Sequence, residues 1–266
     1  MLGAIIGDIV GSRWEFNNIK TKDFELFGNG CYTTDDSVMT CAVAEVLLNG
    51  KSDNREYIVD TFKKWGKKYP SAGYGGRFHH WLFSSDRKPY NSFGNGAAMR
   101  VSPVGWIAET EQEVKDLSRK VTQVTHNHPE GLKGAEVTAM CIFYARMGYS
   151  KDFIRKYVES KYDINFDYEE LKKTYYHGEE ICQNTVPQAL YCFLISNSFE
   201  DCLRTTISIG GDCDTTAAIS CAVAEAFYGT HCDGLGEQAL LYMDKNMKNV
   251  LNRMNKYRFR GIFNGK

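Results

Sequence analysis

The segment Gly210-Gly211-Asp212-Cys213-Asp214-Thr215-Thr216 runs directly into Ala217-Ala-Ile-Ser-Cys-Ala-Val-Ala-Glu-Ala-Phe-Tyr228. The second part contains neither Gly nor Pro, and its small and apolar residues predict a helix over 215–228. The paired glycines allow a tight and unusual backbone path before that helix. The Asp-x-Asp-Thr pattern then places two carboxylates and a hydroxyl at the helix start. Because capping the helix needs only one such group, the surplus indicates a functional site.

A second acidic cluster, Thr33-Thr34-Asp35-Asp36-Ser37, precedes a helix that carries Val38 and Cys41. Taken alone, this cluster is typical of a helix cap. The pentapeptide Cys-Ala-Val-Ala-Glu, however, occurs at 41–45 and again at 221–225, shortly after each acidic cluster. Small residues let helices approach closely. If the two small-residue faces pack together, both acidic helix starts meet in one pocket.

Together the two clusters offer carboxylate and hydroxyl oxygens as potential metal ligands. Carboxylates gathered in one pocket repel one another and take up protons unless a cation compensates them. Ligands that are all oxygen suit Mg²⁺ or Mn²⁺ better than zinc, which favours His and Cys. A centre of two metal ions explains the cluster economically, with a shared carboxylate holding the ions about 4 Å apart.

The composition is that of an ordinary globular protein. The chain has 266 residues, with 32 Lys and Arg against 33 Asp and Glu, and no Pro- or Ser-rich tract divides it. We therefore expect one domain over 1–266. The near-zero net charge argues against a nucleic-acid partner bound through bulk electrostatics.

No targeting or membrane signal is evident in the sequence. The apolar start Met1–Ile6 is short and lacks basic residues, and no apolar stretch reaches the roughly 18 residues of a membrane span. The nine cysteines, from Cys31 to Cys232, include no C-x-x-C pair, which favours reduced buried thiols. We expect a cytoplasmic monomer with no membrane partner.

The apolar periodicity along the chain is helical, and convincing alternating strands are absent, so the sequence predicts an all-α fold. The five prolines stand where a helix could begin or a loop could turn. The expected helices besides 215–228 cover 53–69, 130–147, 186–195, 201–208 and 234–246.

Five motifs, in this order, resemble those of the ADP-ribosylglycohydrolase family, which includes the dinitrogenase-reductase activating glycohydrolase and the eukaryotic ADP-ribosylhydrolases. The motifs are Gly7-Asp8 through Glu15-Phe16, Thr34-Asp35-Asp36-Ser37, Gly94-Asn95-Gly96-Ala97-Ala98-Met99-Arg100, His126-Asn127-His128-Pro129-Glu130, and Gly211-Asp212-Cys213-Asp214-Thr215. The resemblance implies an all-α orthogonal helical bundle, a single domain with a central binuclear metal cleft. It also implies two Mg²⁺ (or Mn²⁺) ions held by Thr34, Asp35, Asp36, Asp212, Asp214 and Thr215, with Asp214 as the bridge.

Further site residues follow from the same resemblance. An isolated Glu15 would be an ordinary surface residue, but the corresponding family glutamate lies on a mobile loop at the metal site. The expected catalytic residues are therefore Glu15, Asp35 and Asp36, each of which could accept a proton from water.

The run from Ser92 to Arg100 is a glycine-rich loop leading into a helix, or an ordinary turn before one. Free backbone N–H groups there could bind a diphosphate. The resemblance implies substrate contacts from Gly94, Asn95, Gly96 and Ala97. Either Phe93 or Tyr90 could stack on a base, although each could equally belong to the core.

His126 and His128 form an H-x-H pair without the accompanying Cys or His residues that a zinc site would need. Each imidazole could orient a carboxylate or contact a ribose, with His128 as a substrate-binding residue, or could simply cap the helix that follows. The segment 73–77 is expected at the substrate-facing rim.

These expectations combine into a metal-dependent hydrolase that cleaves the glycosidic bond between ADP-ribose and an acceptor. Its partner would be an ADP-ribosylated protein or another ADP-ribosyl conjugate. Two other classes fit the same residues. A metal-dependent phosphohydrolase would cut the diphosphate and release AMP, and a non-catalytic ADP-ribose-binding module would bind without turnover.

Overall fold

The structure is a computed structural model, and it describes residues 1–176, 178, 180–229 and 234–258. Over these residues the regular backbone is helical, and the extended pairing amounts to one isolated bridge between Gly94 and Ile181. The predicted all-α fold is therefore confirmed. No helix in this part of the chain is both long and apolar enough to cross a membrane.

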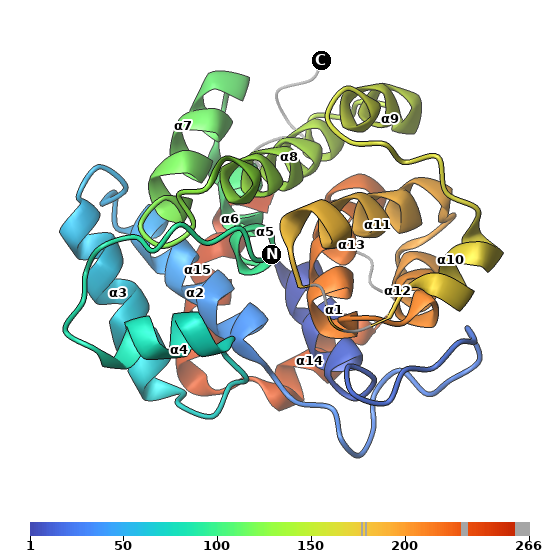
Figure 1. The fold of residues 1–266 in the computed structure, drawn as a ribbon, viewed down its shortest axis with the longest axis horizontal. Coiled ribbons are helices and arrows are strands. Elements are labelled where there is room, and N and C mark those ends of the chain that lie inside the picture. Colours follow the sequence, from blue (N-terminus) through green and yellow to red (C-terminus); the bar gives the residue numbers. More distant parts are fainter. Residues whose placement is uncertain (177, 179, 230–233, 259–266) are drawn as a thin grey trace.

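The helices surround a central pair, α1 and α13 (Figure 1). In chain order they are α1 (Leu2–Ser12), α2 (Asp35–Leu48), α3 (Arg55–Lys68), α4 (Gly76–Phe83), α5 (Gly96–Met99), α6 (Ser102–Ile107), α7 (Glu111–Thr122), α8 (Pro129–Arg146), α9 (Lys151–Glu159), α10 (Tyr168–Thr174), α11 (Cys182–Ile195), α12 (Phe199–Ile209), α13 (Cys213–Tyr228), α14 (Leu235–Tyr242) and α15 (Lys245–Arg258). Their main hydrophobic cluster extends from Met1 to Met254, so both ends of the described chain share one core.

Helix α13 is the buried centre of the bundle, with every residue as far as Glu225 buried. It lies very close to α1, where glycine recurs at Gly3, Gly7 and Gly11. A Cβ at Gly7 would lie 2.3 Å from the carbonyl oxygen of Ala217, so only glycine permits this approach. The contact brings Asp8 of α1 beside Asp214 of α13.

The repeated pentapeptide packs against a different helix from the one we expected. The copy at 221–225 packs against α1, where the carbonyl of Cys221 meets Gly3, rather than against the copy at 41–45 in α2. The glycine stripe of α1 offers a flatter surface than the small residues of α2. Helix α1 contacts both α2 and α13, and the two acidic helix starts still open on one pocket.

Several predicted helices agree with the structure, and two need correction. Helices α3 and α8 confirm the expectations at 53–69 and 130–147. Pro187 does not begin a helix, because it lies inside α11, which starts earlier at Cys182. The missing N–H of this proline costs one intrahelical hydrogen bond, which the buried packing of α11 offsets.

The single helix expected over 234–246 is two helices. Helix α14 ends at Tyr242, and α15 begins at Lys245. Asp244 lies between them and accepts hydrogen bonds at Oδ1 from the backbone N–H groups of Asn246 and Met247, each at 2.9 Å. This carboxylate caps α15, and the extended backbone of Met243 ends α14.

The cysteines that the structure describes are buried thiols, as the sequence predicts. Cys232 lies outside the described residues.

Candidate metal centre

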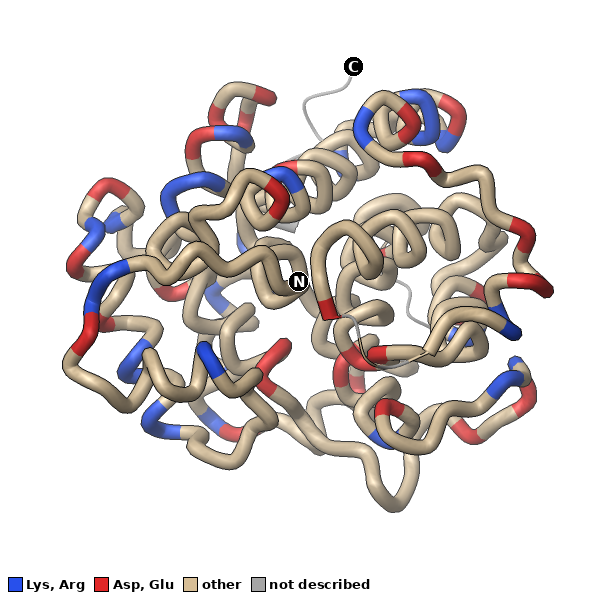
Figure 2. Tube along the Cα trace, viewed as in Figure 1, with Lys and Arg blue, Asp and Glu red and all other residues tan. Residues whose placement is uncertain are grey.

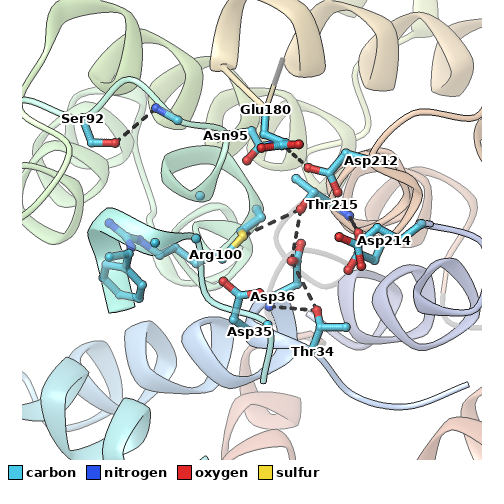
Figure 3. Close-up of a pocket in the computed structure, with 18 of the residues that line it drawn as sticks. Thr34, Asp35, Asp36, Ser92, Asn95, Arg100, Glu180, Asp212, Asp214 and Thr215 are labelled. Carbon is cyan, nitrogen blue, oxygen red and sulfur yellow. Dashed lines mark hydrogen bonds between the residues drawn. The ribbon is translucent and has the colours of Figure 1, made fainter. Parts of the chain in front are cut away.

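One pocket opens where α2 and α13 begin and α1 ends (Figure 3). Acidic residues gather here in the interior, whereas most other charges lie on the periphery (Figure 2). The predicted site residues that line the pocket are Glu15, Thr34, Asp35, Asp36, Gly94, Asn95, Gly96, Asp212, Asp214 and Thr215. The rim segment anticipated at 73–77 contributes four of its residues, Gly73, Gly75, Gly76 and Arg77.

The start of α2 supplies one side of the centre. Thr34 is the N-cap, and its hydroxyl accepts a hydrogen bond from the N–H of Asp36 at 3.3 Å. This cap fixes the first turn of α2, so that Asp35 and Asp36 both face the pocket. Asp36 is buried and Asp35 is half-buried.

The start of α13 supplies the other side. Gly210 and Gly211 adopt φ values of +79° and +72°, the unusual path that the paired glycines predict. The path directs Asp212 and Asp214 into the pocket. Thr215 then links the two helices, because its hydroxyl donates to Oδ2 of Asp36 at 3.1 Å across the centre (Figure 3).

Asp8 is a site residue with no function predicted from the sequence. It lies in α1, fully buried, and accepts hydrogen bonds from the backbone and hydroxyl of both Thr34 and Ser37. The Thr34 hydroxyl donates to Oδ1 of Asp8 at 2.6 Å, which leaves its lone pairs directed away from Asp8. The sequence signal that could have identified Asp8 is a lone carboxylate inside an otherwise apolar helix.

Carboxylate oxygens cluster in two groups with one common member. Asp8, Asp36 and Asp214 form the first group, and Glu15, Asp212 and Asp214 form the second. Within each group the oxygens lie within 4.8 Å of one another, close enough to share one ion. Asp35 lines the pocket outside both groups.

The carboxyl groups hold protons more strongly than ordinary ones. Burial raises the pKa of Asp8 to about 6. Burial also raises the pKa of Asp36 well above its usual range, and the charges of Asp8, Asp35 and Asp212 raise it further. Burial and neighbouring carboxylates raise the pKa of Asp35 and of Asp214 in the same way. This is the repulsion that a divalent cation would relieve.

The donor set fits Mg²⁺ or Mn²⁺. The Oδ1 atom of Asp36 is buried and accepts no hydrogen bond from any residue that the structure describes. A buried carboxylate oxygen without a donor is costly unless a cation compensates it. The clustered atoms are carboxylate oxygens, supplemented by two threonine hydroxyls, and this set matches the preference of hard divalent ions.

The glycine-rich loop forms part of the pocket wall, and two of its amides already have hydrogen-bond partners within the protein. The N–H of Gly94 donates to the hydroxyl of Ser92 at 3.3 Å, and that of Asn95 donates to the carbonyl of Glu180 at 2.9 Å. The segment around Glu180 pairs with the loop and takes up the N–H of Asn95. The side chain of Asn95 instead donates to Oδ2 of Asp212 at 2.6 Å and so supports an acidic residue of the centre.

Three predicted substrate contacts lie away from the pocket lining. Ala97 is buried in the core, and its N–H donates to Gly94. Phe93 is partly exposed, and its ring lies 5.0 Å from that of His128. His128 caps α8 by accepting from the N–H of Glu130 at 3.2 Å, so the capping alternative describes what this imidazole does. Substrate contacts from these residues stay predictions.

The remaining wall contains Tyr90 and His126, as well as Arg100, Glu180 and Phe16, which had no predicted function. Sequence spacing does not reveal that these residues share a pocket, because they come from separate loops. Glu15 and Phe16 lie on the loop after α1, and the Phe16 ring is 78% exposed. A large exposed aromatic ring beside a cleft suits a contact with a bound molecule.

An all-α bundle in which two helix starts converge on buried carboxylates defines a helical protein with a candidate acidic metal centre. Comparison with known proteins makes this class specific. The model of the ADP-ribosylglycohydrolase family matches residues 1–238. The chain therefore belongs to the ADP-ribosylglycohydrolase family, which confirms the resemblance drawn from the five motifs.

Characterised relatives support this placement at low identity. The chain is 27% identical to human ADP-ribosylhydrolase ARH3, over 86% of this chain and 84% of that protein. It is 26% identical to the ADP-ribosyl-[dinitrogen reductase] glycohydrolase of Rhodospirillum rubrum, again over 86% and 84%. A solved structure of an ADP-ribosylglycohydrolase-related protein complex shares the fold, with a TM-score of 0.70, 22% identity and coverage of 97% and 96%.

Proposed function

We propose that this protein is a metal-dependent hydrolase that cleaves the glycosidic bond between ADP-ribose and an acceptor. The observation that carries the proposal is the position of Asp214 in both carboxylate groups at the pocket. A carboxylate shared by two adjacent oxygen clusters is the arrangement expected of a bridge between two ions. Family membership directs this chemistry to ADP-ribosyl conjugates.

Two Mg²⁺ or Mn²⁺ ions would supply Lewis acidity and orient the reacting ribose. Thr34, Asp35, Asp36, Asp212, Asp214 and Thr215 are the proposed metal ligands. Glu15, Asp35 and Asp36 line the same pocket, and each is a proposed acceptor for a proton from the attacking water. The chain's own contribution is to hold these groups in fixed positions before substrate binds.

The proposed substrate is an ADP-ribosylated protein or another ADP-ribosyl conjugate. Gly94, Asn95 and Gly96 line the pocket and are proposed to contact its ADP-ribose part. The proposal treats residues 1–266 as one domain acting as a monomer, and the shared core of α1 and α15 supports the single domain.

A substrate panel tests the proposal. Conjugates of ADP-ribose with arginine, with serine, with nucleic acid and with an O-acetyl group are each incubated with Mg²⁺ and with Mn²⁺. The expected product, identified by mass spectrometry, is intact ADP-ribose from at least one conjugate. Release of AMP would assign the protein to the phosphohydrolases, and binding of ADP-ribose without turnover of any conjugate would make it a binding module.

The Asp214→Ala variant ties turnover to the carboxylate centre. We expect it to lose both tight binding of Mn²⁺, measured by calorimetry, and hydrolysis. Asp60→Ala is the matched control, because Asp60 is an exposed residue of α3 that pairs with Arg87 outside the pocket. Full turnover by metal-free Asp214→Ala protein would contradict a metal-dependent mechanism.

A further inference from the structure

Arg100 is a fully buried cation in the wall of the pocket. It follows α5 directly, and its guanidinium carbon lies 4.9 Å from the centre of the Phe62 ring and 5.5 Å from that of Phe78. Its Nε and Nη1 atoms have no hydrogen-bond partner among the described residues. The ion pairs found in this part of the chain do not include it.

A buried guanidinium in this state is expensive. Desolvation lowers the pKa of Arg100 to about 10, so the side chain still carries its charge at neutral pH. The two aromatic rings compensate part of the loss of hydration. An apolar residue of similar volume would pack there without leaving N–H groups unpaired. The charge must therefore serve an interaction that an apolar side chain could not make.

The single nitrogen of Arg100 that is engaged contacts two neighbours. Nη2 donates to the hydroxyl of Thr125 at 2.8 Å and lies 3.2 Å from Nδ1 of His126. The Thr125 hydroxyl lies 2.8 Å from the same Nδ1 atom. A guanidinium offers only donors, so its contact with Nδ1 is a hydrogen bond in the tautomer whose Nδ1 accepts. In that tautomer the His126 ring is neutral and carries its proton on Nε2.

The other ring nitrogen, Nε2, faces the glycine-rich loop. Nε2 of His126 lies 3.4 Å from the position that a Cβ would take at Gly96, and 3.7 Å from the corresponding position at Gly94. His126 lines the pocket together with both glycines. The absence of side chains at these two positions leaves Nε2 accessible from the pocket.

We propose that Arg100 is a positioning residue that locks His126 in the Nε2–H tautomer, so that His126 donates a hydrogen bond to an oxygen of the bound ADP-ribosyl group. This inference rests on the proposed function. Arg100 and Arg77 also oppose a second proton on the ring, and together with burial they lower the pKa of His126 well below its ordinary value. The ring is thus a fixed neutral donor across the neutral pH range.

The tautomer can be observed directly. In full-length protein containing isotopically labelled histidine, long-range proton–nitrogen NMR distinguishes a protonated ring nitrogen from a bare one. The signals of His126 are identified by their loss in His126→Gln. We expect a bare Nδ1 and a protonated Nε2 with no titration near neutral pH. A proton on Nδ1, or a ring that titrates like a free histidine, would overturn the inference.

Variants of Arg100 test which residue sets the tautomer of His126. Arg100→Met removes the donor and should give a mixture of tautomers, whereas Arg100→Lys retains one donor and should keep more of the Nε2–H form. Phe62→Leu is the matched control, because it loosens the packing around Arg100 but leaves the donor in place. If Arg100→Met does not fold, Arg100→Lys and Thr125→Val still report on the two groups that face Nδ1. An unchanged tautomer in all Arg100 and Thr125 variants would refute the proposed lock.

Binding of ADP-ribose in the presence of Mg²⁺ supplies the second readout. Loss of one hydrogen bond should weaken binding by about tenfold in Arg100→Met and in His126→Gln. The double variant should bind no more weakly than either single one, because both act through one bond. Additive losses would show that Arg100 acts independently of His126.

The two proposals can fail separately. Hydrolysis of an ADP-ribosyl conjugate together with a proton on Nδ1 would leave the proposed function standing and remove the inference about Arg100. Tight ADP-ribose binding with the expected tautomer, but no turnover of any conjugate, would remove the proposed function and leave the inference about Arg100 standing.

Discussion

Asp8 organises the candidate metal centre through its hydrogen bonds to the start of α2. It receives four hydrogen bonds from Thr34 and Ser37, which fixes the start of α2. The hydroxyl proton of Thr34 is committed to Asp8 and one lone pair accepts from the N–H of Asp36, so one lone pair stays available for a cation. Groups that hold metal ligands in place are commonly worth a factor of about 10 to 100 in metal affinity.

We therefore expect Asp8→Asn to weaken Mg²⁺ binding by at least about tenfold, or roughly 1.4 kcal/mol. The single oxygen of the asparagine amide cannot accept all four hydrogen bonds. Its NH₂ group would face the N–H and O–H donors of Thr34 and Ser37, from which it cannot accept a hydrogen bond. Calorimetric titration of the metal-free protein measures the change. Asp201→Asn, which removes a carboxylate of α12 outside the pocket, should leave the affinity unaltered. Equal affinities for Asp8→Asn and the wild type would show that Asp8 does not support the centre.

The residues of the centre differ in how visible they are in the sequence. Asp212, Asp214 and the cluster around Thr34 stand out, because they exceed what helix capping requires. Asp8 does not, because its partner Thr34 lies 26 residues away and only the packing of α1 joins them. Arg100 is equally hidden, since nothing in its neighbours indicates that its guanidinium meets the ring of His126.

At the scale of elements, the crossing of α1 and α13 places the carboxylates. Periodicity predicts most of the helices, but it does not reveal which helix packs on which. The repeated pentapeptide suggested α2 as the partner of α13, whereas the glycines of α1 decide the outcome. The predicted helix start at Pro187 was wrong for a related reason, because burial of α11 outweighs the local cost of an internal proline.

Gly7→Ala tests this crossing. The new Cβ would lie 2.3 Å from the oxygen of Ala217 and 2.7 Å from the nitrogen of Ala218, so the helices must separate. Overpacking of this kind costs about 1–3 kcal/mol, measured as the change in unfolding free energy by urea denaturation. Mg²⁺ binding should weaken as well, because the shift moves Asp8 and Asp214 apart.

Gly76→Ala is the control for that substitution. Gly76 begins α4, and a Cβ there meets no atom within 4 Å, so stability should be unchanged or slightly higher. An equally stable Gly7→Ala protein would mean that α1 and α13 can adjust without cost.

At the scale of the whole molecule, the balance of 32 basic and 33 acidic residues conceals a strongly asymmetric interior. Buried carboxylates face one another across the pocket, and their pKa values are raised. The overall charge is readable from composition, whereas the concentration of like charges at one point depends on the fold. This concentration makes the stability of the protein depend on pH in an uncommon direction.

The metal-free protein should lose stability as the pH rises. Asp8 ionises with a pKa of about 6 in the folded protein, against an ordinary value of 3.8, so the folded state binds more protons than the unfolded state between these values. The unfolding free energy therefore falls as the pH rises through about 6, and the raised pKa values of Asp36 and Asp214 act in the same direction. The fall due to Asp8 is roughly 3 kcal/mol, since a tenfold change in proton affinity corresponds to about 1.4 kcal/mol.

Mg²⁺ should reverse this trend, because the ion binds the ionised carboxylates that repel one another without it. The rise in Tm on adding saturating Mg²⁺ is then small at about pH 5 and large at about pH 8. Thermal unfolding with Mg²⁺ and with a chelator, at a series of pH values, measures both curves. Asp8→Asn should flatten the metal-free curve, because the titrating group is gone. A metal-free protein that grows more stable from about pH 5 to about pH 8 would mean that the carboxylates are already compensated by the protein itself, so that no cation is needed to relieve their repulsion.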